Sequence, residues 1–264
     1  MPWRRRILSS LALLALTGPS VASEREEHEL RSILSKHWEA VGGMRNWSKI
    51  ESIQLNSTVE REGKIVDICI VKKEPNQIRA TVTLPIPGDE ENELQIIRAH
   101  NGETAWTATR VAGAETMTQE ELSPEAARQL LIDAGVLPPL IKVWREGTEL
   151  ELAQPTTVDE QSCFVIQTVD TGTSRTTFYV NSESFDLVGY EFHDASGKTN
   201  RTTIRDYKSV SGIRLPKTTI IESPDTGRST VTLVSAKVGV GIFREYFTTT
   251  VPQKTAQNNA KAAP

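Results

Sequence analysis

The side chains best suited to chemistry are four histidines, and their spacing forms no recognised catalytic or metal-binding motif. His28, His37, His100 and His193 are far apart, and no H-E-x-x-H pattern is present. The sequence contains neither a G-x-S-x-G nucleophile motif nor a phosphate-binding loop. The 34 Asp and Glu residues are expected to form a solvated surface. We therefore predict that the protein is not an enzyme, with no catalytic residues, no metal ligands and no cofactor.

The two cysteines are the remaining reactive side chains. Cys69 and Cys163 both lie in segments with strand-like alternation, and neither has a nearby histidine that could activate it as a nucleophile. An oxidising compartment would permit a disulfide between them. The alternative is two separate, buried thiols, and the spacing leaves both possibilities open.

The first 22 residues have the pattern of a secretory signal peptide. Three consecutive arginines precede an apolar run over residues 7–16, and small residues follow at 20–23. The alternative is an uncleaved membrane anchor, but the run is far shorter than the roughly 20 residues that span a bilayer. Cleavage is expected after Ala22 or Ser23. No cysteine follows the apolar run, so a lipid anchor is not indicated, and the mature protein is predicted to be periplasmic.

Length and composition favour one β-rich domain over residues 23–252. The chain has 264 residues, 38% of them hydrophobic, which is sufficient for a single core. Its net charge of −4 gives no basic patch for nucleic acid. Residues 253–264 are rich in Ala, Asn, Gln and Lys and are predicted to be a disordered tail.

Two segments are predicted to be helical. The first covers residues 23–41, with an apolar stripe, a capping box from Ser23 to Glu26 and a stop at Gly42-Gly43. The second interrupts the strand pattern over residues 118–136, with alternative starts at Thr118 and at Ser123-Pro124. Residues 140–144 are expected to add a further short helical turn.

The rest of the chain alternates with the period of β-strands. We predict about eleven short strands joined by hairpins, which favours a mainly β (α+β) fold built on an incomplete antiparallel β-barrel. The strands are predicted among twelve segments with this pattern, at residues 53–59, 65–71, 78–84, 94–99, 104–109, 148–152, 163–169, 175–180, 187–192, 201–207, 214–221 and 229–238.

Six short motifs occur in the order found in a known family. They are Gly42-Gly43 followed by Trp47, Ile50 and Ile53; Pro75-Asn76 with Arg79; the hairpin Asn101-Gly102-Glu103-Thr104-Ala105-Trp106; Tyr179-Val180-Asn181 followed by Leu187; Asp206-Tyr207 with Gly212-Ile213 and Leu215-Pro216; and Phe247 with Pro252. Together they resemble the outer-membrane lipoprotein-sorting family, the periplasmic lipoprotein carriers. The resemblance implies a half-barrel whose concave face is covered by helices, enclosing a cavity that receives acyl chains.

One position departs from the family pattern. Carriers place a basic residue immediately before Pro-Asn, where it helps to hold the helical lid, whereas this chain has Glu74 there and Lys73 one step earlier. Because neighbouring residues of a strand point to opposite faces, Lys73 cannot be assumed to replace that contact. The chain is also longer and more acidic than a typical carrier, so a relative that shares the cavity is expected rather than a dedicated carrier.

Alternation along the strands gives candidate cavity residues, for which ordinary core packing is the competing interpretation. Cavity-lining candidates are Leu94, Ile96, Phe164, Ile166, Phe178, Val180, Val188, Tyr190 and Phe192. Lid candidates are Leu130, Leu131, Val136, Leu140 and Trp144. Trp106, beside the Asn-Gly turn, is expected to be a packing residue. Which sheet face is concave does not follow from the sequence.

The leading functional hypothesis is a periplasmic, carrier-like protein that binds a lipid or a lipidated protein in a covered hydrophobic cavity. The alternative is a sensor or envelope-assembly module that uses the same fold for contacts with an envelope protein. A third possibility is a surface or secreted structural protein without a ligand.

Overall fold

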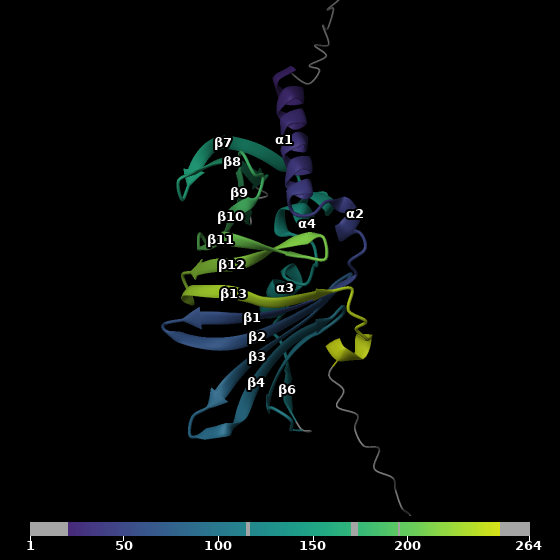
Figure 1. The fold of residues 1–264 in the computed structure, drawn as a ribbon, viewed down its shortest axis with the longest axis vertical. Helices are drawn as coiled ribbons and strands as arrows, with labels where there is room; N and C mark the ends of the chain where they lie inside the picture. The colour runs from purple at the N-terminus through teal and green to yellow at the C-terminus, as the bar shows by residue number, and fades with distance from the viewer. Residues whose placement is uncertain (1–20, 115–116, 170–173, 195, 249–264) are drawn as a thin grey trace, which may run out of the picture.

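The computed structural model describes residues 21–114, 117–169, 174–194 and 196–248. Within this part of the chain, thirteen strands form one open antiparallel sheet, with β6 and β7 at its two edges (Figure 1). The mainly β prediction is therefore confirmed, whereas the predicted count of about eleven strands was too low.

The helices and strands have the following bounds. The helices are α1 (Val21–Ala40), α2 (Met44–Trp47), α3 (Pro124–Ile132) and α4 (Pro139–Arg145), with a 3-10 turn, η1 (Arg244–Phe247). The first strands are β1 (Ser52–Arg61), β2 (Lys64–Lys73), β3 (Gln77–Ile86), β4 (Asp89–Asn101), β5 (Ala105–Val111) and β6 (Thr118–Glu121). The others are β7 (Leu150–Val158), β8 (Gln161–Thr168), β9 (Arg175–Asn181), β10 (Leu187–His193), β11 (Thr199–Val210), β12 (Ile213–Ser223) and β13 (Gly227–Val238).

The sheet consists of two meanders joined at its centre. Strands β1 to β6 pair in sequence toward one edge, α3 and α4 follow, and β7 to β13 pair in sequence back from the other edge. The first and last strands then pair with each other, with Ile53 opposite Val238 and Val59 opposite Val231. Short hairpins therefore account for every strand pair except β1–β13.

The second helical segment begins later than one of the two predicted starts. Residues 118–121 pair with β5 as strand β6, so a helix start at Thr118 was wrong. The start at Ser123-Pro124 is the one observed, and Ser123 Oγ accepts from the N–H of Ala126 at 3.3 Å. Proline favours the first helical position because its missing N–H would be unpaired there anyway.

Two further boundaries differ from the sequence prediction. Ser23 is not the cap of α1, because residues 21 and 22 are already helical. The predicted strands over residues 78–84 and 94–99 both extend toward each other, since β3 continues to Ile86 and β4 starts at Asp89, which leaves only a turn at Pro87 and Gly88. Gly88 supplies the positive φ of 82° that this turn requires.

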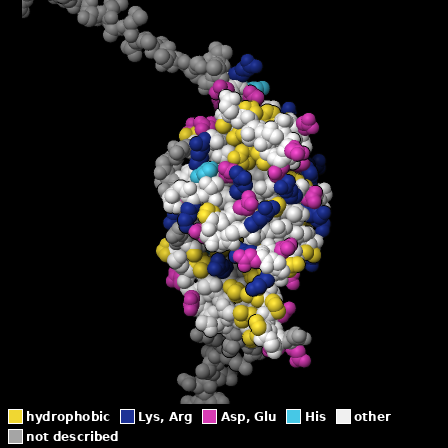
Figure 2. Space-filling model, turned by 90° about the vertical axis from the view of Figure 1, so that its left-hand side faces the viewer, with side chains coloured by type: hydrophobic (Ala, Val, Ile, Leu, Met, Phe, Trp, Pro, Cys, Tyr) yellow, Lys and Arg dark blue, Asp and Glu magenta, His cyan; other side chains and the backbone are white. Residues whose placement is uncertain are grey.

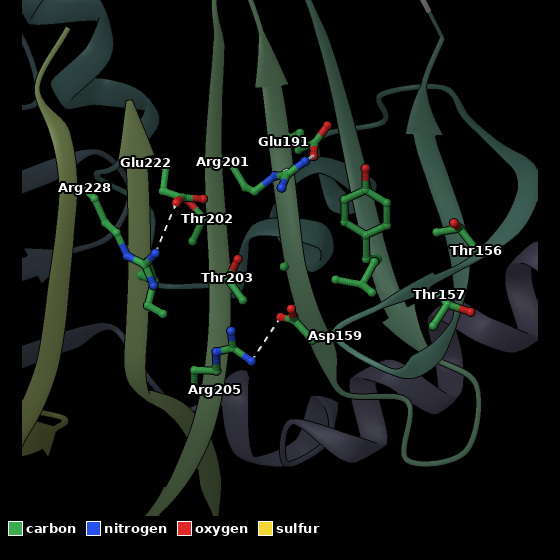
Figure 3. A pocket seen from close by; sticks show the side chains of 14 residues that line it. Thr156, Thr157, Asp159, Glu191, Arg201, Thr202, Thr203, Arg205, Glu222 and Arg228 are labelled. Atoms are coloured by element: carbon green, nitrogen blue, oxygen red, sulfur yellow. Dashed lines mark hydrogen bonds and ion pairs between the residues drawn. The ribbon is translucent and has the colours of Figure 1, made fainter. Parts of the chain in front are cut away.

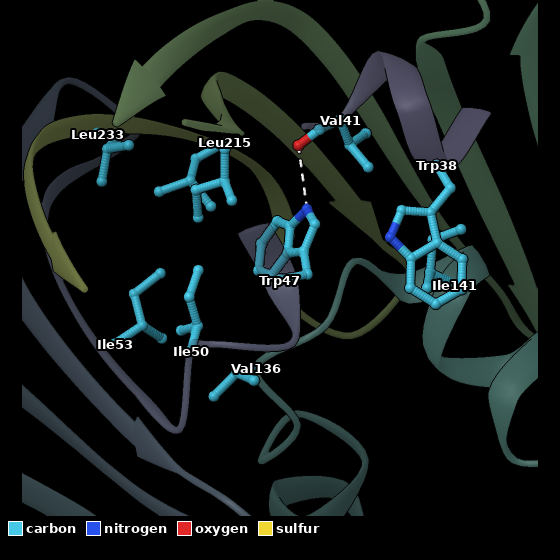
Figure 4. Close-up of a cluster of buried hydrophobic side chains, with 10 residues drawn as sticks. Trp38, Val41, Trp47, Ile50, Ile53, Val136, Ile141, Leu215 and Leu233 are labelled. Atoms are coloured by element: carbon cyan, nitrogen blue, oxygen red, sulfur yellow. Dashed lines mark hydrogen bonds between the residues drawn. The ribbon is translucent and has the colours of Figure 1, made fainter. Parts of the chain in front are cut away.

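Helices α1 and α4 pack on one face of the sheet, which we call the helix face and define as the face of β1 that carries Ile53. A first buried cluster joins Trp38 of α1 and Ile141 of α4 to β1, β12 and β13 (Figure 4). A second joins Leu34 of α1 and Leu140 of α4 to β8–β11. The core therefore lies under the helices, over the half of the sheet formed by β1 and β8–β13.

Two of the glycine motifs meet where α1 ends. Gly42 lies so close to the β11–β12 turn that a Cβ atom on it would be 2.5 Å from the carbonyl oxygen of Gly212. Asn46 Nδ2 donates to the carbonyls of both glycines, at 2.8 and 3.0 Å. Trp47 Nε1 donates to Val41 O at 3.0 Å (Figure 4). These contacts fix the exit of α1 against the sheet, which explains why glycines are needed there.

The outer face of β3–β5, opposite the helix face, is covered by the segment that follows β13. Trp106 is buried with Ile97, Ala99 and Ala108, and its Nε1 donates to Phe247 O at 3.0 Å. This confirms Trp106 as a packing residue.

No helix among the described residues is long and apolar enough to span a membrane.

Candidate ligand-binding face

Strands β2 to β5 carry the helix face beyond the packed core. Residues directly opposite each other in an antiparallel pair point to the same side. Leu55 pairs with Ile70, Ile70 with Ala80, Ile68 with Val82, and Val82 with Ile96, so the face of Ile53 and Leu55 continues across these strands. We call this side of the four strands the β2–β5 apolar face; its half-buried aliphatic members lie on β2, β3 and β4 and are Val66, Ile68, Ile70, Ala80, Val82, Leu84, Leu94 and Ile96.

The two halves of the helix face thus differ in how fully their apolar side chains are covered. Ile166 and Val180 are 0% exposed beneath α1 and α4, and Phe178 is 1% exposed. The aliphatic side chains of the β2–β5 apolar face retain part of their exposure to solvent. Exposed apolar surface in a contiguous set is the feature that distinguishes a binding face from a core.

The predicted cavity residues divide between these two environments. Leu94 and Ile96 belong to the β2–β5 apolar face, whereas the others lie in the strands of the packed half. Ile166, Phe178 and Val180 are members of the second cluster, and Phe164 and Tyr190 pack against it. Phe192 is half-buried in β10, and Val188 is buried where the pairing of β9 and β10 shifts register.

The predicted lid residues divide in the same way. Leu140 is 0% exposed in the second cluster, Val136 belongs to the first, and Trp144 contacts both. Leu130 and Leu131 are half-buried on α3, which contacts β3, β4 and β5. Because η1 occupies the outer face of β3 and β4, α3 lies against these strands on the helix face.

The loop that follows α3 is held to the sheet by two polar side chains at the end of β2. Lys72 Nζ donates to the carbonyl of Gly135 at 3.2 Å, and Glu74 Oε1 accepts from the N–H of Val136 at 3.2 Å. Lys72 lies opposite Ile53 and so is on the helix face. We call these two contacts the loop latch.

The loop latch resolves the question raised by Glu74. A basic residue before Pro75 is absent, yet position 74 still holds the loop, as a hydrogen-bond acceptor rather than a donor. Lys73 turns to the outer face, where its Nζ donates to Ile242 O at 2.6 Å. The donor on the helix face is Lys72, which sequence reasoning missed, although it continues the alternation of Ile68 and Ile70.

Burial shapes the electrostatics of the loop latch. The pKa of Lys72 is lowered, chiefly because burial penalises the ammonium form, while the carboxylates of Asp133 and Glu74 act in the opposite direction. The nearby Lys142 lowers this pKa further. A buried charge is costly unless it is paired, so Lys72 is stabilised only while the loop that carries Asp133 and Gly135 stays in place.

The histidines and cysteines make structural contacts. His37 and His100 contact the carbonyls of Phe185 and Asn76 at 2.8 and 3.0 Å. Both cysteines are free thiols, Cys69 in β2 and Cys163 buried in β8, so the disulfide alternative is wrong. Over the described ranges, no three His, Cys, Asp or Glu side chains are grouped to hold a metal ion.

Comparison with solved structures shows which known proteins have a similar architecture. A LolA superfamily protein from Nitrosomonas europaea is 14% identical, with a TM-score of 0.53 over 83% of this chain and 96% of that one. A DUF1329 family protein from Desulfovibrio piger is 12% identical, with a TM-score of 0.50 over 82% and 97%. The chain shares their fold.

A third similar structure is a domain from Vibrio parahaemolyticus described as an outer membrane lipoprotein-sorting protein, 12% identical, with a TM-score of 0.49 over 81% of this chain and 97% of that one. No protein-family model and no curated protein matches the sequence. The similarity to the LolA superfamily structure, with its TM-score of 0.53, confirms the resemblance inferred from the six motifs at the level of fold.

Proposed function

We propose that this protein binds the acyl chains of a lipid or a lipidated protein on the β2–β5 apolar face, beneath α3. The observation that carries the proposal is the contrast between the two halves of the helix face. One half is filled by α1 and α4, and the other presents half-buried aliphatic side chains from three neighbouring strands to a single short helix.

An acyl chain suits this face energetically. Its transfer from water gains about 0.8 kcal/mol for each buried CH₂ group. Flexible methylene chains can follow the rows formed by Ile68, Val82 and Ile96, which lie opposite one another across β2, β3 and β4. For an acyl chain to enter, α3 must move away from the sheet. The loop latch holds the loop that follows α3, so α3 would move about this point.

The fold supports this reading by analogy. One similar solved structure is that of a LolA superfamily protein, and the structural match extends over most of the present chain. Fold alone does not fix function, so the residues of the β2–β5 apolar face carry the argument. With the predicted signal peptide over residues 1–22, of which residues 1–20 lie outside the described part of the chain, the proposed site of action is the periplasm.

Acyl-chain binding can be tested directly on the purified full chain. Organic extraction followed by mass spectrometry should recover a co-purifying lipid. After delipidation, a dansyl-labelled fatty acid should gain fluorescence on binding and be displaced by unlabelled oleate. Absence of both the lipid and saturable probe binding would contradict the proposal.

A second candidate is a module that binds an envelope protein. It is favoured because Ile166, Phe178 and Val180 are buried in the core. The part of the helix face that remains open is therefore smaller than a cavity that extended across the whole sheet. Crosslinking in envelope preparations, followed by mass spectrometry, would support this candidate if a single stoichiometric partner appeared and the fatty-acid probe did not bind.

A further inference from the structure

A polar pocket of about 480 Å³ lies on the outer face of the sheet, on the side opposite α1 and α4. Its lining comes from the β7–β8 hairpin and from strands β9 to β13, with Tyr179, Glu191, Arg201 and Thr203 among its residues (Figure 3). This volume is in the range of small-molecule sites, which is about 300–1,000 Å³. The apolar face considered for acyl chains is on the other side of the sheet.

A bend in the edge hairpin builds one wall of the pocket. The pairing of β7 with β8 shifts register between Ala153 and Thr156, around Pro155. The tip of the hairpin then crosses the outer face, because Asp159 forms an ion pair of 3.1 Å with Arg205 of β11 (Figure 3). In the sheet order, β9 and β10 lie between β8 and β11. The tip of the hairpin is therefore held over these two strands, although β7 and β8 themselves still form the edge of the sheet.

The floor of the pocket is formed where a strand lacks a side chain. Gly189 lies opposite Tyr179 on β9 and Thr203 on β11, and all three residues line the pocket. A Cβ atom on Gly189 would lie 2.4 Å from the carbonyl oxygen of Thr202, so the strands approach too closely for another residue. Glycine inside a strand leaves space above the backbone that a ligand can use.

Charged side chains of alternating sign form the remaining surface. In register across four strands, Glu191 pairs with Arg201, Arg201 lies opposite Glu222, and Glu222 lies opposite Arg228. The nitrogen–oxygen distances are 2.5 Å for Arg201–Glu191 and 3.7 Å for Arg228–Glu222. With Asp159 and Arg205, three acidic and three basic side chains line the pocket, so its formal charge is balanced.

This balance decides which ligand chemistry fits. An anion would meet three carboxylates and a cation three guanidiniums, so neither gains a net attraction. Each guanidinium carries five N–H donors and each carboxylate several acceptor sites, more than one ion pair uses. Figure 2 shows acidic and basic side chains interspersed in the same way over the middle of the face drawn there.

We propose that this outer pocket binds a neutral, hydroxyl-rich ligand, an oligosaccharide of two or three sugar units. Vicinal hydroxyls both donate and accept, so they match alternating guanidinium and carboxylate groups. The ring of Tyr179 and the methyl groups of the threonines at the hairpin tip supply the apolar contacts that the C–H face of a sugar requires. The pocket is thus a second site, with chemistry opposite to that of the β2–β5 apolar face.

Calorimetric titration of the full chain with cellotriose, maltotriose and chitotriose tests this proposal, with trigalacturonate and trilysine as charged probes. At least one neutral trisaccharide should bind, and its Kd should change less than about twofold between about 50 and 500 mM NaCl, because no net charge is neutralised. Failure of all three neutral probes, or binding of a charged probe alone, overturns the proposal.

Two pocket variants and one control variant locate the binding site. Arg201→Ala removes donors, and Thr157→Trp fills the pocket from its exposed hairpin wall without altering the floor. Each should weaken binding at least about tenfold, equivalent to about 1.4 kcal/mol. Arg31→Ala is the matched control, since Arg31 is also an exposed, ion-paired arginine but lies on α1. Equal losses in all three variants would overturn the assignment. Fatty-acid probe binding should be unchanged in each.

Discussion

The carboxylate of Glu74 accepts a hydrogen bond from the backbone N–H of Val136, with 3.2 Å between Oε1 and the nitrogen. This contact joins the end of β2 to the loop between α3 and α4. Lys72 reinforces it two residues earlier by donating to Gly135 O. Because α3 is only nine residues long, these two side chains act as polar restraints on how closely it lies over the β2–β5 apolar face.

Replacing Glu74 with alanine should loosen this loop. The N–H of Val136 would lose a charged acceptor, and such hydrogen bonds contribute about 1.5–3 kcal/mol. Hydrogen exchange followed by mass spectrometry should show residues 133–137 exchanging at least about tenfold faster. Glu60→Ala, at an exposed position at the far end of β1, is the control and should leave this exchange unchanged. Equal exchange in both variants would show that the contact is not significant in solution.

Polar substitution on the β2–β5 apolar face should weaken acyl-chain binding while the fold is retained. Ile96→Gln places an amide where methylenes would lie, and Ile96 is half-buried, so the free protein tolerates it. Loss of one or two methylene contacts corresponds to about a tenfold weaker Kd for the fatty-acid probe. Val234→Gln is the control, because Val234 is an apolar side chain 56% exposed on β13. The assignment of the site fails if both variants bind equally.

Truncation of candidate cavity residues should separate core from binding face. Phe178 is 1% exposed and packs beneath α1, so Phe178→Ala should lower the free energy of unfolding by about 3–5 kcal/mol. Leu94 is half-buried, and Leu94→Ala should cost about 1 kcal/mol or less. Urea denaturation measures both values. A large cost at Leu94 would mean that α3 already covers it completely.

The fold could be predicted from local patterns because hairpins dominate it. Alternation and turn residues located the strands, and motif residues distant in sequence turned out to be in contact. Trp106 meets Phe247 through a hydrogen bond of 3.0 Å, and Gly42 meets Gly212 at the end of α1. Strand β6 was missed because Thr118–Glu121 has no apolar residue to alternate.

The sites were less predictable, for a physical reason. Alternation identifies the two faces of a strand but not which part of a face is covered by helices. Leu94 and Ile166 have the same pattern, yet one is half-buried and the other is 0% exposed. The outer pocket depends on the bend at Pro155 and on an ion pair between Asp159 and Arg205, whose meeting is set by tertiary structure.

Stability should fall in mild acid because of His37. Its ring is 0% exposed, its Nδ1 donates to Phe185 O at 2.8 Å, and its buried Nε2 has no hydrogen-bond partner among the described residues. Burial lowers the pKa of His37 below its usual 6.5, although the Phe185 carbonyl and the Asp186 carboxylate oppose this. Protonation of Nε2 would bury an N–H without an acceptor, so the native ring stays neutral.

The sign of the effect follows from proton uptake. Below the usual pKa of 6.5 the unfolded chain binds a proton that the native chain does not, so stability is lost as the pH falls from 6.5 toward the lowered native pKa. The slope for one such group is at most about 1.4 kcal/mol per pH unit.

Other carboxyl and histidine groups also titrate, so the wild-type chain must be compared with His37→Gln, whose amide can still donate to Phe185. Urea denaturation between pH 7.5 and 5 should show the smaller loss for His37→Gln, whereas His28→Gln, at an exposed position on α1, should follow the wild type. Parallel curves for all three proteins would show that His37 becomes charged without cost in the native state, and hence that the end of α1 opens to water.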